Sequence, residues 1–153
     1  MHDLAMRLGE DPKLWRLVGL LHDIDYEETK NNPPMHGLRS AEILEGKLPE
    51  EALKAIKAHN DLTGFKYESK LTYALKAADQ VSGLIVATAL VMPHRKLCEV
   101  KVESLIKKFK KKDFARRVDR SKILLCEKLG LSLREFLEIS LKALQRIHEK
   151  LGL

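Results

Sequence analysis

Cysteine is scarce in this chain, and no apolar segment is long. Cys98 and Cys126 have no second cysteine at CxxC spacing, which argues against a thiolate zinc site or a redox pair. No apolar run approaches the roughly 20 residues that span a bilayer. Asp3, Glu10 and Asp11 interrupt the region where a signal peptide needs an apolar core. We therefore expect a cytoplasmic protein with no membrane partner.

Proline and glycine are also sparse, at 5 and 8 residues, and only 5% of the residues are aromatic. Collagen-like, disordered and disulfide-scaffold chains are excluded on this composition. The 153 residues are 44% hydrophobic and 33% charged, which is enough apolar material for one compact core. No repeat, low-complexity tract or linker divides the chain. We therefore expect one domain over residues 1–153, with a core part over 1–92 and a basic helical part over 93–153.

Helical periodicity runs through nearly every segment and β-branched alternation is almost absent, which predicts an all-α fold. Asp11 followed by Pro12 predicts the start of a helix that runs to about Asp23. The helix breakers at 31–34 predict a loop over 27–35. Further helices are predicted near residues 37–46, 49–60, 68–91, 102–110, 113–118, 120–129 and 132–151. The helix over 68–91 is expected to be the central buried element.

Positive charge is concentrated in one short stretch. The chain has 28 Lys and Arg against 22 Asp and Glu, and residues 101–117 alone hold eight basic and two acidic residues. Two interpretations stay open, a surface for a phosphate-bearing partner or a solvated helix face. Phe109 and Phe114 are its only aromatic residues, and no helix-turn-helix or OB pattern is present. A nucleic-acid partner is therefore not expected.

Three histidines fall at the ends of predicted helices. His22, followed by Asp23, closes the helix that begins at Pro12, whereas His36 opens the helix over 37–46 and His59 ends the helix over 49–60. The last two helices are joined by a short turn and run antiparallel, so the start of one and the end of the other meet. We therefore expect His36 and His59 to converge.

Asp79 lies in the middle of the long helix among alanines, where a buried carboxylate requires a cation. With the three histidines and Asp23 it makes a mixed nitrogen and oxygen ligand set. Such a set suits Fe, Mn, Co, Ni or Zn, with Mg as a weaker option. Five ligands are enough for one or two ions, and Asp23 is the candidate bridging ligand. Taken singly, each histidine could equally be a surface or core residue.

Four segments carry a resemblance to a known family. GLLHDIDYE, HGLRSAEIL, the HN pair at 59–60 and AADQVSGLI follow one another in an order and spacing that resembles the HD-domain superfamily of metal-dependent phosphohydrolases. More narrowly, the chain resembles a group of small stand-alone HD proteins of bacteria and archaea, and this resemblance extends over nearly its whole length. The resemblance implies an all-α fold with a metal site among the central helices.

The same resemblance assigns roles to individual residues. His22 and Asp23 match the signature doublet, Asp79 matches the closing aspartate, and His36 and His59 match the additional histidines of members with two metals. Such members cleave phosphoester or phosphoanhydride bonds with a hydroxide activated by metal.

One feature of the family is not matched. Members carry a further metal-ligand histidine on the helix before the doublet, and the sequence provides only 21 residues before His22. His2 is the only candidate substitute, and we expect it to be a surface residue. A missing ligand is expected to lower metal affinity.

Charged residues around the ligand set are candidates for supporting roles. Asp25 could orient the attacking water or protonate a leaving group, and the alternative is an exposed loop acid or a partner for a basic residue. Arg39, Lys76, Arg95 and Lys96 could bind substrate phosphates at the rim of the site. Solvated side chains are the alternative for each of these cations.

We therefore expect a metal-dependent phosphohydrolase that cleaves a phosphomonoester, or a phosphodiester or anhydride, of a small nucleotide-like substrate. A homodimer is the candidate assembly. The rival interpretation is a non-catalytic HD-like domain that senses nucleotides or serves as an oligomeric scaffold. Metal content separates the two, because only the enzyme requires bound metal.

Overall fold

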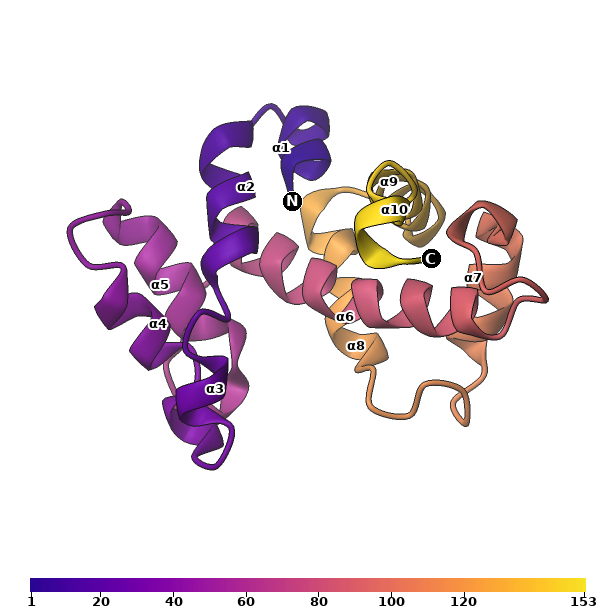
Figure 1. Ribbon diagram of the computed structural model, residues 1–153. Coiled ribbons are helices and arrows are strands. Elements are labelled where there is room, and N and C mark those ends of the chain that lie inside the picture. Colours follow the sequence, from indigo (N-terminus) through magenta and orange to yellow (C-terminus); the bar gives the residue numbers. More distant parts are fainter. The chain divides into compact units, whose positions relative to one another are not determined.

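The computed structural model describes residues 1–153 and consists of helices without any strand, which confirms the predicted all-α class (Figure 1). The chain forms two compact units, Met1–Lys76 and Ala77–Leu153. The longest helix, α6 (Lys70–Leu90), runs across the boundary between them. One domain over 1–153, divided after residue 92, stays a prediction. No helix has both the length and the apolar character needed to cross a membrane.

Short helices make up most of both units. In the first unit they are α1 (His2–Leu8), α2 (Pro12–Leu21), α3 (Tyr26–Thr29), α4 (Leu38–Ile43) and α5 (Glu50–His59), with 3-10 turns at Pro33–Met35 and Asp61–Thr63. In the second unit they are α7 (Val102–Lys110), α8 (Arg120–Ile123), α9 (Leu133–Gln145) and α10 (His148–Leu151), with 3-10 turns at Leu97–Glu99 and Leu124–Leu129.

Helix α2 begins where the sequence predicts because Asp11 caps it. The Asp11 carboxylate accepts the backbone N–H groups of Lys13 and Leu14, and a proline occupies the first helical position. The helix ends at Leu21, slightly earlier than expected, and His22 is its C-cap residue. The side chains after the cap therefore belong to a turn, where they can point in different directions.

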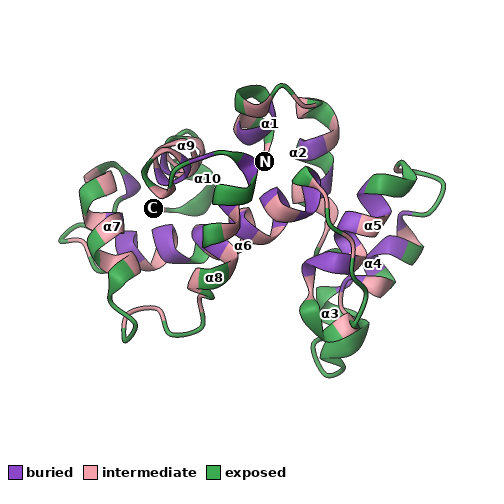
Figure 2. Cartoon of the chain, turned by 180° about the vertical axis from the view of Figure 1, so that it is seen from behind, coloured by how far each residue is buried: buried purple, intermediate pink, exposed green.

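Helices α4 and α5 pack against each other; His59 is the last residue of α5, and His36 lies just before the N-cap residue of α4. The buried side of α5 is built mainly from alanines, which allow a close approach between helices; its buried apolar residues are Ala52, Leu53, Ala55, Ile56 and Ala58. In Figure 2 the buried residues of α5 alternate with residues of intermediate exposure along the helix.

The second unit has its own apolar core. Leu105 of α7, Ile123 of α8 and Phe136 and Leu137 of α9 are all fully buried. Helix α9 packs against α7 and against the turn at Leu97–Glu99. Helix α10, in contrast, is exposed along its length (Figure 2).

The helix predicted over 113–118 is wrong, because residues 112–118 form turns and bends. The guanidinium group of Arg120 donates hydrogen bonds to the carbonyl oxygens of Ala115 and Val118, both at 2.7 Å, of Lys111 at 3.2 Å, and of Phe114. These carbonyl groups are thus satisfied without a helix. Ala115 also has a φ of 45°, which a regular helix does not allow.

Three other predicted segments are partly wrong. The expected loop over 27–35 contains α3 and the turn at Pro33–Met35. The expected helix over 120–129 changes to 3-10 geometry after Ile123. The expected helix over 132–151 is interrupted after Gln145, because Ile147 has a φ of −116° and a ψ of 16°. The helix predicted over 102–110 is confirmed.

Replacing Arg120 by Lys should destabilise the second unit by about 1–3 kcal/mol, because an ammonium group cannot bond four carbonyls in a planar fork and leaves some of them unsatisfied. Urea unfolding of both proteins measures the difference. Arg116→Lys is the matched control, since Arg116 is exposed in the same loop. Equal stabilities of the two variants would contradict the role assigned to Arg120.

Candidate metal centre

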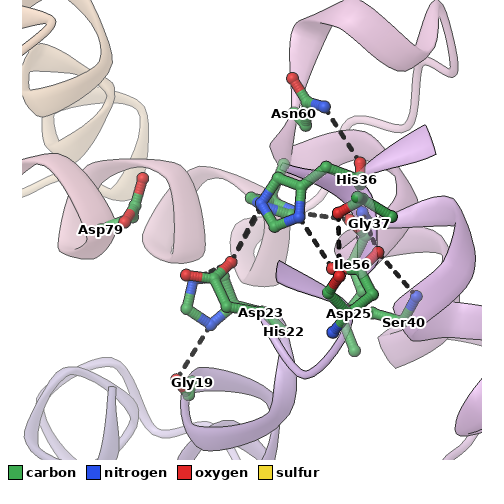
Figure 3. Close-up of polar contacts among 12 residues, drawn as sticks. Gly19, His22, Asp23, Asp25, His36, Gly37, Ser40, Ile56, Asn60 and Asp79 are labelled. Carbon is green, nitrogen blue, oxygen red and sulfur yellow. Dashed lines mark hydrogen bonds and ion pairs between the residues drawn. The ribbon is translucent and has the colours of Figure 1, made fainter. Parts of the chain in front are cut away.

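Three histidine rings and one carboxylate lie together in the first unit (Figure 3). The Nε2 atoms of His22, His36 and His59 lie 3.1, 3.2 and 3.5 Å from the same atom, Oδ1 of Asp23. The Nε2 atoms of His36 and His59 are 3.3 Å apart. Ligand atoms of His22, Asp23 and His59 all lie within 4.8 Å of one another. The structure therefore brings together four of the five ligands expected from the sequence.

Each of these rings is held by a hydrogen bond from its other nitrogen. His22 and His59 donate from Nδ1–H to the carbonyl oxygen three residues earlier in the chain, at 3.0 and 2.6 Å. His36 donates from Nδ1–H to a carboxylate oxygen of Asp25 at 2.8 Å. Carbonyl and carboxylate oxygens only accept, so the proton of each neutral ring lies on Nδ1. Each Nε2 atom therefore directs a lone pair at the others.

This arrangement is unfavourable without a cation at its centre. Each of the three Nε2 lone pairs lies 3.1–3.5 Å from Oδ1 of Asp23, those of His36 and His59 lie 3.3 Å from each other, and all of these atoms are acceptors. A proton on one Nε2 would relieve one of these repulsions, whereas a metal ion would bind all four atoms. Metal-binding histidines characteristically donate their other N–H to a carbonyl or carboxylate, as all three do here. The donor set therefore fits a transition-metal ion.

The cluster opens to solvent on the side of its carboxylate. The side chain of Asp23 is 45% exposed, whereas those of His22, His36 and His59 are 13%, 20% and 5% exposed. Catalytic metal sites keep a coordination position for water or substrate, while structural sites are closed by protein ligands. The exposed edge at Asp23 therefore suits a catalytic site better than a structural one.

Burial and the histidines act on the pKa of Asp23 in opposite directions. Burial would raise the pKa of this carboxyl. When the rings are protonated, a hydrogen bond from Nε2–H of His59 and the positive charges of His22, His59 and His36 outweigh the effect of burial, so the pKa of Asp23 lies below its usual value. Asp23 is thus available as an anionic ligand.

Gly37 lets the start of α4 lie directly against the end of α5. Its φ is +89°, and a Cβ atom at this position would lie 2.9 Å from the carbonyl oxygen of Ile56 and 3.0 Å from Cε1 of His59. The same carbonyl of Ile56 holds the ring of His59. No side chain fits in this space, so the glycine is what allows His36 and His59 to meet.

Asp25 is buried beneath His36 and has no exposed surface. One carboxylate oxygen accepts the Nδ1–H of His36, and the other accepts the backbone N–H groups of Gly37 at 2.7 Å and Ser40 at 3.0 Å (Figure 3). Burial would raise the pKa of Asp25, but the bonds from Gly37, His36 and Ser40 lower it overall. These contacts favour a positioning role for Asp25, acting through His36. The direct catalytic role expected from the sequence stays a prediction.

Asn60 and Ser40 support the cluster, although neither is predicted from the sequence as a site residue. The Asn60 amide donates to the carbonyl oxygens of Pro33 and His36 at 2.7 and 3.0 Å, which ties the loop before α4 to the end of α5. Ser40 Oγ accepts the backbone N–H of Asp25 at 3.3 Å. The polar Asn directly after His59, at a helix end, was the available signal for the first of these contacts.

Asp79 lies in the second unit, where Gln80 donates a hydrogen bond to its carboxylate at 2.8 Å. The expectation that it is deeply buried is wrong, because its burial is intermediate and its carboxylate has a polar partner. Its role as a metal ligand stays a prediction. His2, the candidate substitute ligand, is exposed in α1 and contacts the carboxylate of Asp3, in agreement with a surface residue.

The cations proposed for substrate binding occupy different environments. Arg39 is exposed and forms ion pairs with Glu28 and Glu42, at 3.0 and 3.1 Å. Lys76 forms an ion pair with Asp61 at 2.6 Å. Both belong to the first unit, whereas Arg95 and Lys96 are exposed residues of the second unit. A substrate role for all four stays a prediction.

Comparison with protein families identifies the chain. The family model for the HD domain matches residues 1–86, which is more than half of the sequence and includes the entire histidine cluster. The chain therefore belongs to the HD-domain family, whose members are typically metal-dependent hydrolases. Comparisons with curated proteins and with solved structures gave no significant match.

Gly37→Ala should destabilise the first unit by about 2–4 kcal/mol, because the new methyl group meets backbone and adopts a positive φ. Gly46→Ala is the control: its φ of +71° is similar, but a Cβ there has no neighbour within 4 Å. Thermal or urea unfolding should show a clearly smaller loss for the control. Equal losses of stability in the two variants would show that the positive φ alone accounts for glycine at position 37, and would contradict the role of the close contact with α5.

Asp25→Asn should weaken metal binding by about 10- to 100-fold, since an amide can no longer accept from His36, Gly37 and Ser40 with both of its polar atoms. Titration calorimetry with Mn²⁺ or Zn²⁺ measures the affinity. Asp11→Asn is a matched control, because asparagine also caps helices and Asp11 lies in the cap of α2. A metal affinity of Asp25→Asn equal to that of the control would refute the positioning role.

Proposed function

We propose that this chain is a metal-dependent phosphohydrolase that acts on a small nucleotide-like phosphate ester or anhydride. The observation that carries the proposal is the convergence of three Nε2 lone pairs on the solvent-facing carboxylate of Asp23. Membership in the HD-domain family supports the reaction class. The substrate class is supported by the surroundings of the cluster.

His22, Asp23, His36 and His59 would hold one or two divalent ions, with Fe, Mn, Co, Ni or Zn suited to their nitrogen and oxygen donors and Mg as a weaker option. A bound ion of this kind lowers the pKa of a water molecule and neutralises charge on phosphoryl oxygens. The protein fixes the orientation of the histidine rings through their Nδ1–H bonds. Asp23, as the most exposed ligand, marks the side from which substrate approaches.

An aromatic ring lies beside the cluster and supports a nucleotide-like substrate. Tyr26 is 56% exposed, and its ring meets that of His36 edge to face with 5.9 Å between the centroids. A base could stack on the free face of Tyr26 while its phosphate reaches the cluster, because aromatic rings pair well with nucleobases. Arg39 and Lys76 would bind phosphate oxygens only after exchanging their present carboxylate partners.

The proposal is tested by metal analysis and by hydrolysis assays with Mn²⁺, using p-nitrophenyl phosphate, bis-p-nitrophenyl phosphate and a panel of nucleoside mono- and polyphosphates. We expect metal to co-purify with the protein and at least one substrate to be turned over. His59→Gln and Asp23→Asn should lose bound metal and more than about 100-fold of the activity. His148→Gln, an exposed histidine in α10, should retain both.

His59 is buried, so His59→Gln could lose metal because packing is disturbed. Asp23 is solvent-facing, and Asp23→Asn should remove a ligand without disturbing packing. Circular dichroism would verify that both variants are folded. A folded wild-type protein that binds no metal from Mn²⁺, Fe²⁺ or Zn²⁺ solutions would overturn the enzyme proposal and favour a scaffold. Metal binding without hydrolysis of any substrate in the panel would contradict the proposed substrate class.

A further inference from the structure

The second half of α7 and the turns that follow it present a dense set of cations without ion-pair partners. We call residues 107–117 the basic loop. Its exposed basic side chains are Lys107, Lys110, Lys111, Lys112, Arg116 and Arg117. None of the six is in an ion pair, and Asp113 is the only acidic residue of the segment. The clustering seen in the sequence is therefore a feature of the surface and is not cancelled by folding.

The basic loop is held in a fixed shape, although only its first residues, 107–110, are helical, and the rest form the turns after α7 (Figure 1). Arg120 bonds four of its backbone carbonyls or those next to it, and the ammonium group of Lys108 lies 4.3 Å from the centroid of the Phe114 ring. At its end the backbone N–H of Asp119 donates to the side chain of Gln80 in α6 at 2.8 Å. The cations are thus presented by a preorganised segment, which reduces the entropy lost on binding a partner.

The fixed shape maintains a concentration of like charge that costs free energy in the isolated protein. Arg120 increases this charge, since its guanidinium bonds carbonyl groups and no carboxylate. A solvated helix face, the alternative considered from the sequence, accounts only for Lys107 and Lys110 on α7, because the other four exposed cations lie on the segment that follows the helix. A partner with closely spaced negative charges would be complementary to the observed arrangement.

We propose that the basic loop binds the phosphate backbone of a duplex nucleic acid, without reading its sequence. From the sequence, the lack of aromatic residues for stacking predicted that no nucleic acid binds here. Base stacking, however, matters for the binding of single strands and for base recognition, and duplex binding does not require it. Phe109 and Phe114 are half-buried, and Lys108 covers the ring of Phe114, so neither offers a platform for unpaired bases. Contacts to backbone phosphates need only correctly placed cations.

An anionic membrane is a weaker match for this surface. Peripheral membrane segments combine basic residues with apolar side chains that enter the lipid. The large apolar residues of the basic loop, Phe109 and Phe114, are half-buried in the protein. The basic loop lies entirely in the second unit, so the proposal is independent of the metal centre and of its chemistry.

The test compares binding of the full chain to a fluorescent RNA duplex, a single-stranded RNA of the same length, and vesicles containing phosphatidylserine, over a range of salt concentrations. The variant is Lys110→Gln, Lys112→Gln, Arg116→Gln. The control is Lys13→Gln, Arg16→Gln, Lys66→Gln, which removes the same number of exposed lysines and arginines from the first unit. Both triple variants alter only exposed side chains, so both should fold.

We expect the wild-type chain and the control to prefer the duplex, with an affinity that falls steeply as salt rises. The basic-loop variant should bind the duplex about 100-fold more weakly at 0.1 M salt, and the slope of log K against log salt should fall by about 2 to 3. No duplex binding by the wild-type chain, or equal losses in both triple variants, would overturn the proposal. Preference for the vesicles or for the single strand would also overturn it.

Discussion

The candidate site depends on the electrostatic repulsion among four hydrogen-bond acceptors held close together. Three imidazole rings point their unprotonated nitrogens at the same carboxylate oxygen, and each ring is prevented from turning away by a hydrogen bond from its Nδ1–H. If no cation binds between these groups, their repulsion destabilises the folded chain and no other contact offsets it. A bound cation converts the same four atoms into a ligand set, so the features that make the empty cluster unfavourable make the metal-bound one stable.

Several parts of the first unit hold these four acceptor groups close together. The turn after α2 supplies the doublet, the end of α5 supplies a buried histidine, and the residue before the N-cap of α4 supplies the third ring. Gly37 permits the contact between α4 and α5, and Asp25 joins the start of α4 to the ring of His36. These supporting residues lie beside the metal ligands in the sequence. Short motifs around the individual ligands can therefore encode both the ligands and their orientation.

The sequence correctly placed His22 and His59 at helix ends, because the capping residues and breakers that set those ends act locally. Convergence of His36 and His59 followed from the expected hairpin of two adjacent helices. The turns over 112–118 could not be predicted, since they depend on Arg120, a residue outside the segment, satisfying its carbonyl groups. Periodicity also cannot report what a carboxylate contacts. The burial of Asp25 and the intermediate exposure of Asp79 therefore emerged only from the structure.

The most direct test of the metal centre is a long-range proton–nitrogen NMR spectrum of the six histidine rings, recorded before and after addition of Zn²⁺. The account predicts the Nδ1–H tautomer for His22, His36 and His59 in the neutral state, and Zn²⁺-induced shifts of their Nε2 resonances. His2, His94 and His148 should remain unchanged. Protons on Nε2 of the clustered rings, or Zn²⁺ shifts that do not distinguish the two groups of histidines, would contradict it.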